Sequence, residues 1–191
     1  MLETAGQLIC FGYNTKTMPK FVNPFSLGIV IFWIVADQAL KLWTMANIPY
    51  KSYNYFEPIP NFLSLGHDVN FGAAWSLFAG SGASPILILG RGFAGFVLLF
   101  WLWQKPRSKL ETMAISLIAA GAWGNCIDGV LRGGVVDMLQ SHWLSAIYQP
   151  IFGTPFPIFN LADTGVVGGA ILWAGLQMLQ KPHSITALQN P

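Results

Sequence analysis

Charged residues are scarce in this chain. Lysine, arginine, aspartate and glutamate make up 9% of its 191 residues, whereas hydrophobic residues make up 53%. Globular domains carry about 25% charged residues, so a water-soluble domain of this length would lack polar surface, and the composition favours the bilayer as solvent. The net charge of +2 is small, and the basic residues form no single patch, which argues against nucleic acid as a partner.

Metal-binding patterns are also missing. The two cysteines, Cys10 and Cys126, are far apart in the chain and form no CxxC pair. The three histidines, His67, His142 and His183, show no paired ligand spacing, and we expect each of them on the surface or in a loop. The sequence therefore predicts no metal site and no cofactor.

Long apolar stretches are what the chain does have. Four of them approach the roughly 20 residues needed to cross a bilayer, and they cover residues 25–45, 85–103, 110–127 and 160–179. We expect a mainly α-helical integral membrane protein with four transmembrane helices.

Basic residues indicate how these helices are oriented, because cytoplasmic loops are enriched in lysine and arginine. They precede the first stretch, fill the turn between the second and third, and follow the fourth: Lys16, Lys20, Lys105, Arg107, Lys109 and Lys181. Both termini are therefore predicted to be cytoplasmic. The chain divides into an N-terminal extension (1–24), a four-helix membrane domain (25–180) with outer loops at 46–84 and 131–159, and a tail (181–191).

The outer loops have distinct compositions. The first is rich in aromatic residues, which suit the membrane interface, and contains a strand-like segment near 61–65. We expect a small extracytoplasmic β-sheet followed by a short amphipathic helix near 72–78. The second loop is long enough to act as a flap over the space between the helices.

Four of the eight acidic residues lie within the apolar stretches or near their ends: Asp37, Asp128, Asp137 and Asp163. In the predicted topology, all four reach a similar depth near the outer face. Ionisable groups at membrane depth indicate function. Two adjacent carboxyls share a proton and can activate water, as in aspartic proteases.

Each of these acids also has a purely structural explanation. Asp37 and Lys41 are spaced i, i+4, so they predict either a buried ion pair or a substrate-binding role. Asp128 could pair with Arg132, Asp163 could cap a helix, and Asp137 could be a loop acid. Their shared depth makes a common site the better interpretation.

Four motifs carry a family resemblance. They read DQALK at 37–41, NFGAAWSL at 70–77, GAWGNCIDGVLRGGVVDM at 121–138 and FNLAD at 159–163. In this order, over about residues 25–180, they resemble the lipoprotein signal peptidase (signal peptidase II) family. The resemblance implies an intramembrane aspartic endopeptidase of the bacterial cytoplasmic (inner) membrane. It would remove signal peptides from diacylglyceryl-modified prolipoproteins, cutting before the lipidated cysteine.

The resemblance also implies roles for individual residues. Asp137 and Asp163 would be the catalytic pair, near the outer face of the membrane. The remaining motif residues would support the site or bind substrate: Asp37, Lys41, Asn70, Gly124, Asn125, Asp128, Arg132 and Asn160. The expected partners are the lipid-modified prolipoprotein, membrane lipid and the cyclic peptide inhibitor globomycin, and the protein is expected to be a monomer.

One departure from the family pattern concerns Gly129. The third motif usually has arginine directly after its aspartate, where this chain has Gly129, and Arg132 lies one turn later. This loss favours one alternative, a non-catalytic membrane assembly factor. A small proton or ion transporter is the other, because intramembrane carboxylates often mark proton relays. The absence of a polar chain through the cytoplasmic half argues against the transporter.

Overall fold

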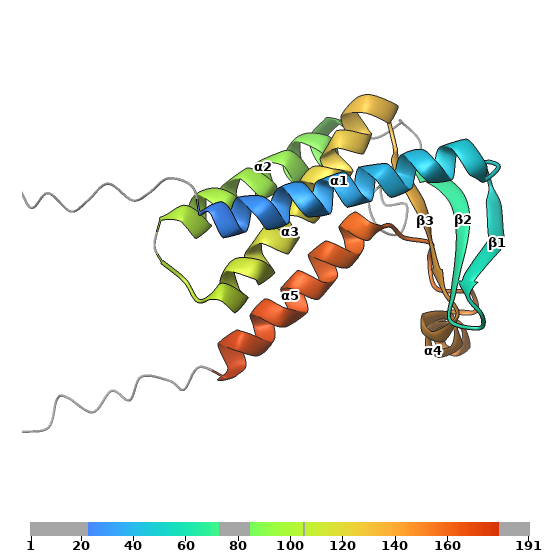
Figure 1. The fold of residues 1–191 in the computed structure, drawn as a ribbon. Coiled ribbons are helices and arrows are strands. Elements are labelled where there is room, and N and C mark those ends of the chain that lie inside the picture. Colours follow the sequence, from blue (N-terminus) through green and yellow to red (C-terminus); the bar gives the residue numbers. More distant parts are fainter. Residues whose placement is uncertain (1–22, 73–84, 105, 180–191) are drawn as a thin grey trace, which may run out of the picture.

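A bundle of helices with a small sheet at one end forms the protein (Figure 1). The computed structural model describes residues 23–72, 85–104 and 106–179. The expected amphipathic helix near 72–78 lies almost wholly outside the described residues, as do nearly all of the N-terminal extension and the tail. The long helices are α1 (Pro24–Asn47), α2 (Pro85–Trp103), α3 (Lys109–Arg132) and α5 (Leu161–Leu179).

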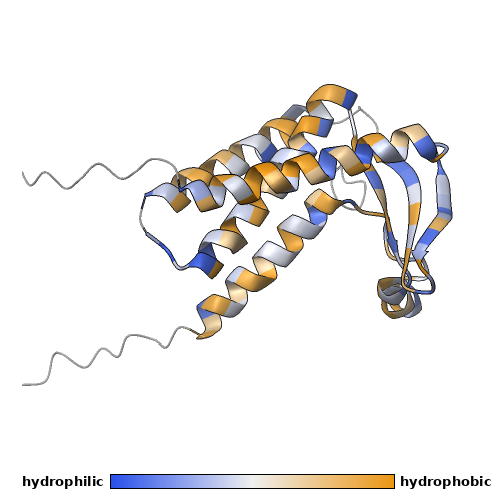
Figure 2. Cartoon of the chain, in the orientation of Figure 1, coloured by the Kyte–Doolittle hydropathy of each residue, from blue (hydrophilic) through white to orange (hydrophobic). Residues whose placement is uncertain are grey.

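The long helices expose apolar side chains and bury polar ones. Phe32 is 68% exposed and Ile86 is 79% exposed, whereas Asp37, Lys41 and Asp128 are completely buried. Figure 2 shows hydrophobic residues along the outer faces of the bundle. Among the described helices, α1, α2 and α3 are long and apolar enough to cross a membrane, and α5 is not one of them. The chain is therefore a mainly helical protein with three candidate spans.

Helix α3 is the centre of the bundle, since α1, α2 and α5 all pack against it. Small residues allow α5 to approach closely. A Cβ atom on Gly169 would lie 2.6 Å from the carbonyl oxygen of Ala114. The helix starts at a capping box between Ser108 and Glu111, and it ends at Gly133, which has a φ of 69°. It extends five residues beyond the predicted end at 127.

The sheet has three antiparallel strands in the order β1 (Ser52–Ile59), β2 (Leu63–Asn70) and β3 (Val135–Ser141). The predicted strand near 61–65 overlaps β2, which begins at Leu63 and continues to Asn70. The loop at 131–159 is more than a flap, because it contains β3 and a helix, α4 (His142–Phe152). The second outer loop thus completes the sheet that the first one begins.

A small apolar core joins the sheet to the end of α1. It consists of buried Ile48, Leu65, Val136 and Met138. The expectation that His67 lies on the surface was wrong. His67 is buried, and its Nδ1 lies 2.8 Å from the carbonyl oxygen of Ile48. This histidine therefore ties β2 to the end of the first long helix.

Candidate active site

Asp137 and Asp163 come from different elements but share one hydrogen-bonding partner. Asp137 lies in β3 and Asp163 in the first turn of α5. The side chain of buried Asn160 donates to Oδ1 of Asp137 at 2.6 Å, and its Oδ1 accepts from the backbone N–H of Asp163 at 2.8 Å. The backbone N–H of Asn160 also donates to Oδ2 of Asp163. The two carboxyls, called the carboxyl pair below, are thus connected through one asparagine.

The backbone on either side of the carboxyl pair is also fixed. The N–H groups of Met138 and Leu139 both donate to the carbonyl oxygen of Phe159, and the N–H of Phe159 donates back to Leu139. These bonds hold the segment before α5 alongside β3 as a short additional bridge. As a result, Asn160 emerges next to the residue that follows Asp137.

Two more amides contact the carboxyl pair. Asn125 of α3 donates from Nδ2 to Oδ1 of Asp163 at 2.7 Å. Asn70, at the end of β2, forms a side-chain hydrogen bond with Asp137. Within the described part of the chain, neither carboxyl forms an ion pair with lysine or arginine. Neutral amides therefore orient both groups without neutralising them.

The pKa of Asp137 is raised well above its ordinary value. Burial is the main cause, because it removes water from the charged form, and the nearby charge of Asp163 acts in the same direction. Hydrogen bonds from Asn160 and Asn70 and the more distant charge of Lys41 oppose the shift. The surroundings thus favour a protonated carboxyl at Asp137.

A second polar group lies beside the carboxyl pair, and here a cation is present. Lys41 of α1 places its Nζ 2.8 Å from Oδ2 of Asp37 and 2.8 Å from Oδ2 of Asp128. All three side chains are fully buried, and we call them the Lys41 cluster. The same Nζ donates to Oδ1 of Asn125 at 3.2 Å. For Asp37 and Lys41, the structure therefore shows the ion pair that was one of the two predicted alternatives.

The Lys41 cluster also holds the two elements that carry the carboxyl pair. Oδ1 of Asp37 accepts from the backbone N–H of Ala162 at 2.8 Å, next to Asp163. Oδ2 of Asp128 accepts from the backbone N–H of Val136 at 3.0 Å, next to Asp137. Each acid of the cluster thus fixes the residue immediately before one member of the carboxyl pair.

Gly124 makes the close approach of these groups possible. A Cβ atom at this position would lie 2.9 Å from Oδ2 of Asp37 and 3.1 Å from Cβ of Ala162. A side chain there would have to displace the buried ion pair or the start of α5. Glycine is needed at position 124 because there is no space for a side chain, and not because the backbone has an unusual φ angle.

Arg132 pairs with Asp128, the aspartate directly after which the family motif usually has arginine. Its guanidinium pairs with Oδ1 of Asp128 and donates to Gln38. A Cβ on Gly129 would lie 2.6 Å from Cγ1 of Ile88 in α2, so a larger residue at 129 does not fit this packing. Gly129 in place of the usual arginine therefore does not favour a non-catalytic assembly factor.

Sequence reasoning missed the contribution of Gln38. Its side-chain Nε2 donates to Oδ1 of Asp128 at 2.9 Å and to the carbonyl oxygen of Gly124 at 3.2 Å. Its Oε1 accepts from the guanidinium of Arg132. Gln38 lies inside the first motif, between two assigned residues, and this position was the available signal. It completes the hydrogen bonding of the acid that Arg132 and Lys41 share.

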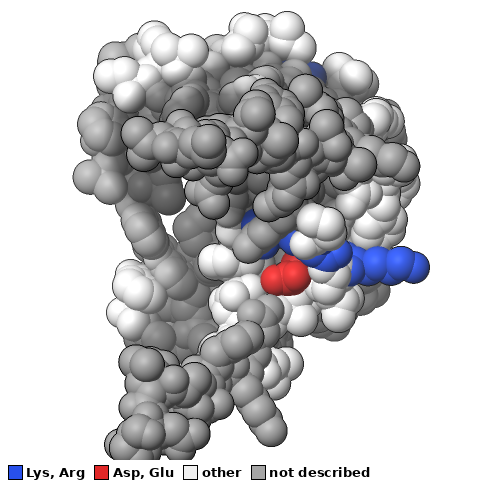
Figure 3. Space-filling model, turned by 90° about the vertical axis from the view of Figure 1, so that its left-hand side faces the viewer, with Lys and Arg blue, Asp and Glu red and all other residues white. Residues whose placement is uncertain are grey.

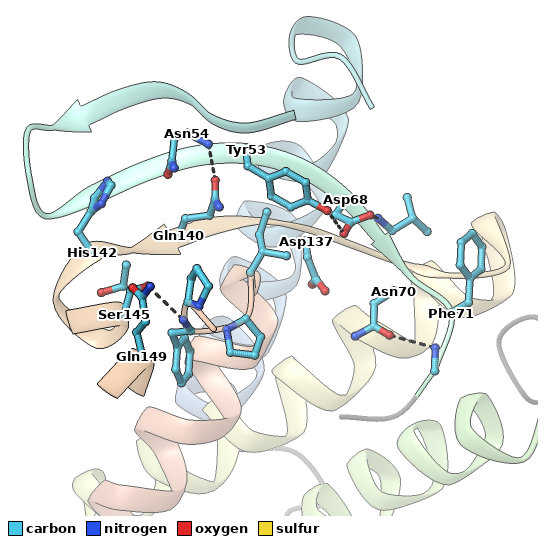
Figure 4. A pocket seen from close by; sticks show the side chains of 17 residues that line it. Tyr53, Asn54, Asp68, Asn70, Phe71, Asp137, Gln140, His142, Ser145 and Gln149 are labelled. Atoms are coloured by element: carbon cyan, nitrogen blue, oxygen red, sulfur yellow. Dashed lines mark hydrogen bonds between the residues drawn. The ribbon is translucent and has the colours of Figure 1, made fainter. Parts of the chain in front are cut away.

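A cavity of about 860 Å³ opens on the sheet side of the site, between β2, β3, α4 and the segment at 155–158. Asp137 and Asn70 line it (Figure 4). Asp68, which was not predicted as a site residue, also lines it. In the antiparallel pairing of β2 with β3, Asp68 lies directly opposite Asp137. No group of three or more candidate ligands arranged for a metal ion occurs among the described residues.

Comparison with known proteins gives consistent matches over most of the chain. The family described as signal peptidase (SPase) II matches residues 29–179. A lipoprotein signal peptidase of Deinococcus radiodurans is 46% identical over 153 residues, which cover 80% of this chain and 78% of that protein. One from Serratia marcescens is 35% identical over 170 residues, covering 88% and 94%.

Solved structures match as well. A bacterial membrane enzyme solved by the in meso method at 2.3 Å resolution superposes with a TM-score of 0.68 and 31% sequence identity. That match covers 88% of this chain and 94% of the other. A second such structure, at 1.9 Å resolution, gives a TM-score of 0.66 with 31% identity over 83% and 95% of the two chains.

Proposed function

The chain belongs to the signal peptidase II family of aspartic peptidases, which remove signal peptides from prolipoproteins, and we propose that Asp137 and Asp163 are its catalytic carboxyls. The observation that carries this assignment is the bridge through Asn160, which brings both groups to one partner without a cation on either. Other acids of the membrane region, Asp37 and Asp128, are bound to Lys41. They are positioning residues in this proposal.

The reaction requires one protonated and one ionised carboxyl. The ionised carboxylate takes a proton from water, and the hydroxide attacks the scissile carbonyl carbon while the other carboxyl protonates its oxygen. The tetrahedral intermediate then collapses, and the amine leaves with a proton returned from the pair. Burial raises the pKa of the Asp137 carboxyl, which suits it to hold a proton at rest, and in this proposal Asp163 acts first as the base.

The membrane arrangement follows from the same assignment. We place α5 as a fourth span, because its 19 residues equal the length of α2 and it packs along α3. Its exposed residues include Val167, Ile171 and Met178. Both termini are then cytoplasmic, and the sheet and the carboxyl pair lie at the outer face.

Charge at the opposite end of the bundle supports this orientation. Arg107 and Lys109 lie in and after the connection between α2 and α3, where Arg107 stacks on Trp101 at 3.8 Å. Figure 3 views this end and shows basic side chains gathered there beside an acidic one. Lysine and arginine mark cytoplasmic ends of membrane helices.

The substrate in this proposal is a prolipoprotein whose cysteine carries a diacylglyceryl group, and the cut falls directly before that cysteine. The acyl chains stay in the outer leaflet against the exposed apolar faces of the helices. The scissile peptide then reaches the carboxyl pair from the membrane side. A monomer suffices, since one chain supplies every group named above. Globomycin is expected to block the site.

The test is cleavage of a lipidated prolipoprotein by the purified protein, followed by mass spectrometry. We expect the mass to fall by that of the signal peptide, and globomycin to prevent this. Asp137→Asn and Asp163→Asn should each lower the rate by about 10²–10⁴-fold or more, the range supplied by acid–base groups.

The matched control is Glu111→Gln, which removes a carboxylate at the start of α3, at the other end of the bundle from the sheet. Glutamine can still close the capping box there, so the rate should be unchanged. Near-normal turnover by either asparagine variant would refute the assignment of the pair.

A further inference from the structure

The cavity beside Asp137 extends well beyond the carboxyl pair. Its volume of about 860 Å³ is in the range of ligand-binding pockets, roughly 300–1,000 Å³. Figure 4 shows Asp137 and Asn70 in one part of it and His142, Ser145 and Gln149 in another. Asp163 is not among its lining residues. The cavity therefore offers room for more of the substrate than the scissile bond.

Polar and apolar residues both line this cavity. Ten of its seventeen residues have polar side chains, and they come from the sheet and α4 rather than from the long helices: Tyr53, Asn54, Asp68, Asn70, Asp137, Gln140, Ser141, His142, Ser145 and Gln149. A signal peptide is apolar and stays in the bilayer. The polar groups of the cavity suit the other product, whose polypeptide extends into water after the modified cysteine while its acyl chains stay in the bilayer.

Asp68 gives this cavity a negative charge next to the reaction site. Asp68 and Asp137 are direct partners in the antiparallel pairing of β2 with β3, and such partners have Cβ atoms about 5 Å apart on the same face. Both side chains line the cavity. A peptide segment bound in the cavity next to Asp137 would therefore lie close to Asp68.

The carboxylate of Asp68 is held but not neutralised. Its Oδ2 accepts from the hydroxyl of Tyr53 at 2.7 Å, and its Oδ1 accepts from the backbone N–H of Val69 at 2.8 Å. This hydrogen bond raises the pKa of Tyr53 to about 12, so the phenol keeps its proton and remains the donor. Among the described residues, the ion pairs do not include Asp68.

We propose that the cavity binds the first residues after the modified cysteine and that Asp68 sets their charge preference, favouring lysine or arginine and disfavouring aspartate or glutamate. The inference rests on the proposed function of the carboxyl pair. Asp68 takes no part in bond cleavage, so it determines which prolipoproteins are cut efficiently and not whether the chemistry occurs. A carboxylate accepts up to about four hydrogen bonds, and Asp68 uses two within the protein.

The test uses three diacylglyceryl-modified prolipoprotein peptides that are identical except for the three residues after the cysteine. The three residues after the cysteine are all lysine in the first peptide, all glutamine in the second and all glutamate in the third. The wild-type protein should show kcat/KM in the order lysine, glutamine, glutamate, with steps of roughly fivefold, as expected for a partly exposed charge pair. In about 1 M salt, where charges are screened beyond roughly 3 Å, the order should collapse.

The variant Asp68→Asn should cut all three peptides within about twofold of one another. Unfolding in detergent, measured beside the wild-type protein, shows that the variant folds. Glu111→Gln, at the start of α3 and away from the cavity, should keep the wild-type order. Equal rates of the wild-type protein on the three peptides, or an unchanged order in Asp68→Asn, would overturn the proposal. Failure of the carboxyl-pair assignment appears separately, as cleavage of the glutamine peptide by Asp137→Asn.

Discussion

The Lys41 cluster and the carboxyl pair each contain two aspartates, and Asn125 contacts both groups, yet they are built differently. Asp37 and Asp128 are bound to a buried lysine. Asp137 and Asp163 are bound to asparagine side chains and have no ion-pair partner in the described chain. A cation fixes a carboxylate in its charged form, whereas an amide orients it and leaves its proton free to move. The first group holds the structure, and the second can do chemistry.

The largest expected effect comes from removing the cation of the first group. Lys41→Met keeps the length of the side chain but leaves Asp37 buried without a counter-ion and Asp128 with Arg132 as its remaining cation. We expect a loss of about 3–5 kcal/mol of stability and, with it, of activity. Unfolding measured in detergent checks this. Lys109→Met changes an exposed lysine at the start of α3 and should leave stability unchanged, and equal stability of the two variants would contradict the division between the groups.

The next effect concerns the amide that connects the second group. Asn160→Ala removes hydrogen bonds to both members of the carboxyl pair. Small displacements of catalytic groups can cost about 10²-fold in rate, and we expect kcat to fall by about that factor with little change in KM. Steady-state kinetics on the glutamine peptide would show it. An unchanged kcat would mean that the bridge does not position the pair.

A pH experiment tests the raised pKa of Asp137. The pKa of Asp137 is higher in the folded than in the unfolded state. At pH values between these two pKa values, the folded state therefore binds more protons. Its contribution to stability is therefore fully present below the unfolded pKa of about 4 and is lost as pH rises through the folded value. Asp137→Asn should remove this slope from unfolding measured against pH. Retention of the full slope in that variant would assign it to another group.

The smallest effect is expected at the edge of the Lys41 cluster. Arg132→Gln removes one ion pair of Asp128, but Lys41 still holds the other oxygen. Because Arg132 is 17% exposed, we expect about 1 kcal/mol of lost stability or less, with the cleavage rate within about twofold of wild type. A loss as large as that of Lys41→Met would show that the guanidinium, and not the lysine, neutralises this acid.

The sequence predicted the long helices and their acidic residues better than it predicted the helix ends and the pairing of the β-strands. The second helix begins and ends where hydropathy placed it, and the first differs by one or two residues at each end. Helix α3 continues to Arg132 because Gly129, Val130 and Leu131 keep helical geometry until Gly133. Apolar runs report burial in lipid, but the end of a helix depends on its cap.

Pairings between distant segments were beyond the reach of sequence patterns. β3 was read as part of a flap, because nothing local shows that it pairs with β2, about 70 residues earlier. For the same reason Asp68 was not recognised as the neighbour of Asp137. The motifs predicted Asp37, Asn125 and Asn160 as polar supports, and the structure adds which atom each of them holds.

The two ion pairs within single helices bear on how the protein is made. Asp37 and Lys41 are four residues apart in α1, and Asp128 and Arg132 are four apart in α3. Each helix thus brings its own counter-ion when it leaves the ribosome and enters lipid, which lowers the cost of inserting a charge before its neighbours exist. The contact from Lys41 to Asp128 can form only after α3 has been synthesised, and that from Asp37 to Ala162 only after α5 begins. Biogenesis can therefore proceed helix by helix, with the final ionic connections made last.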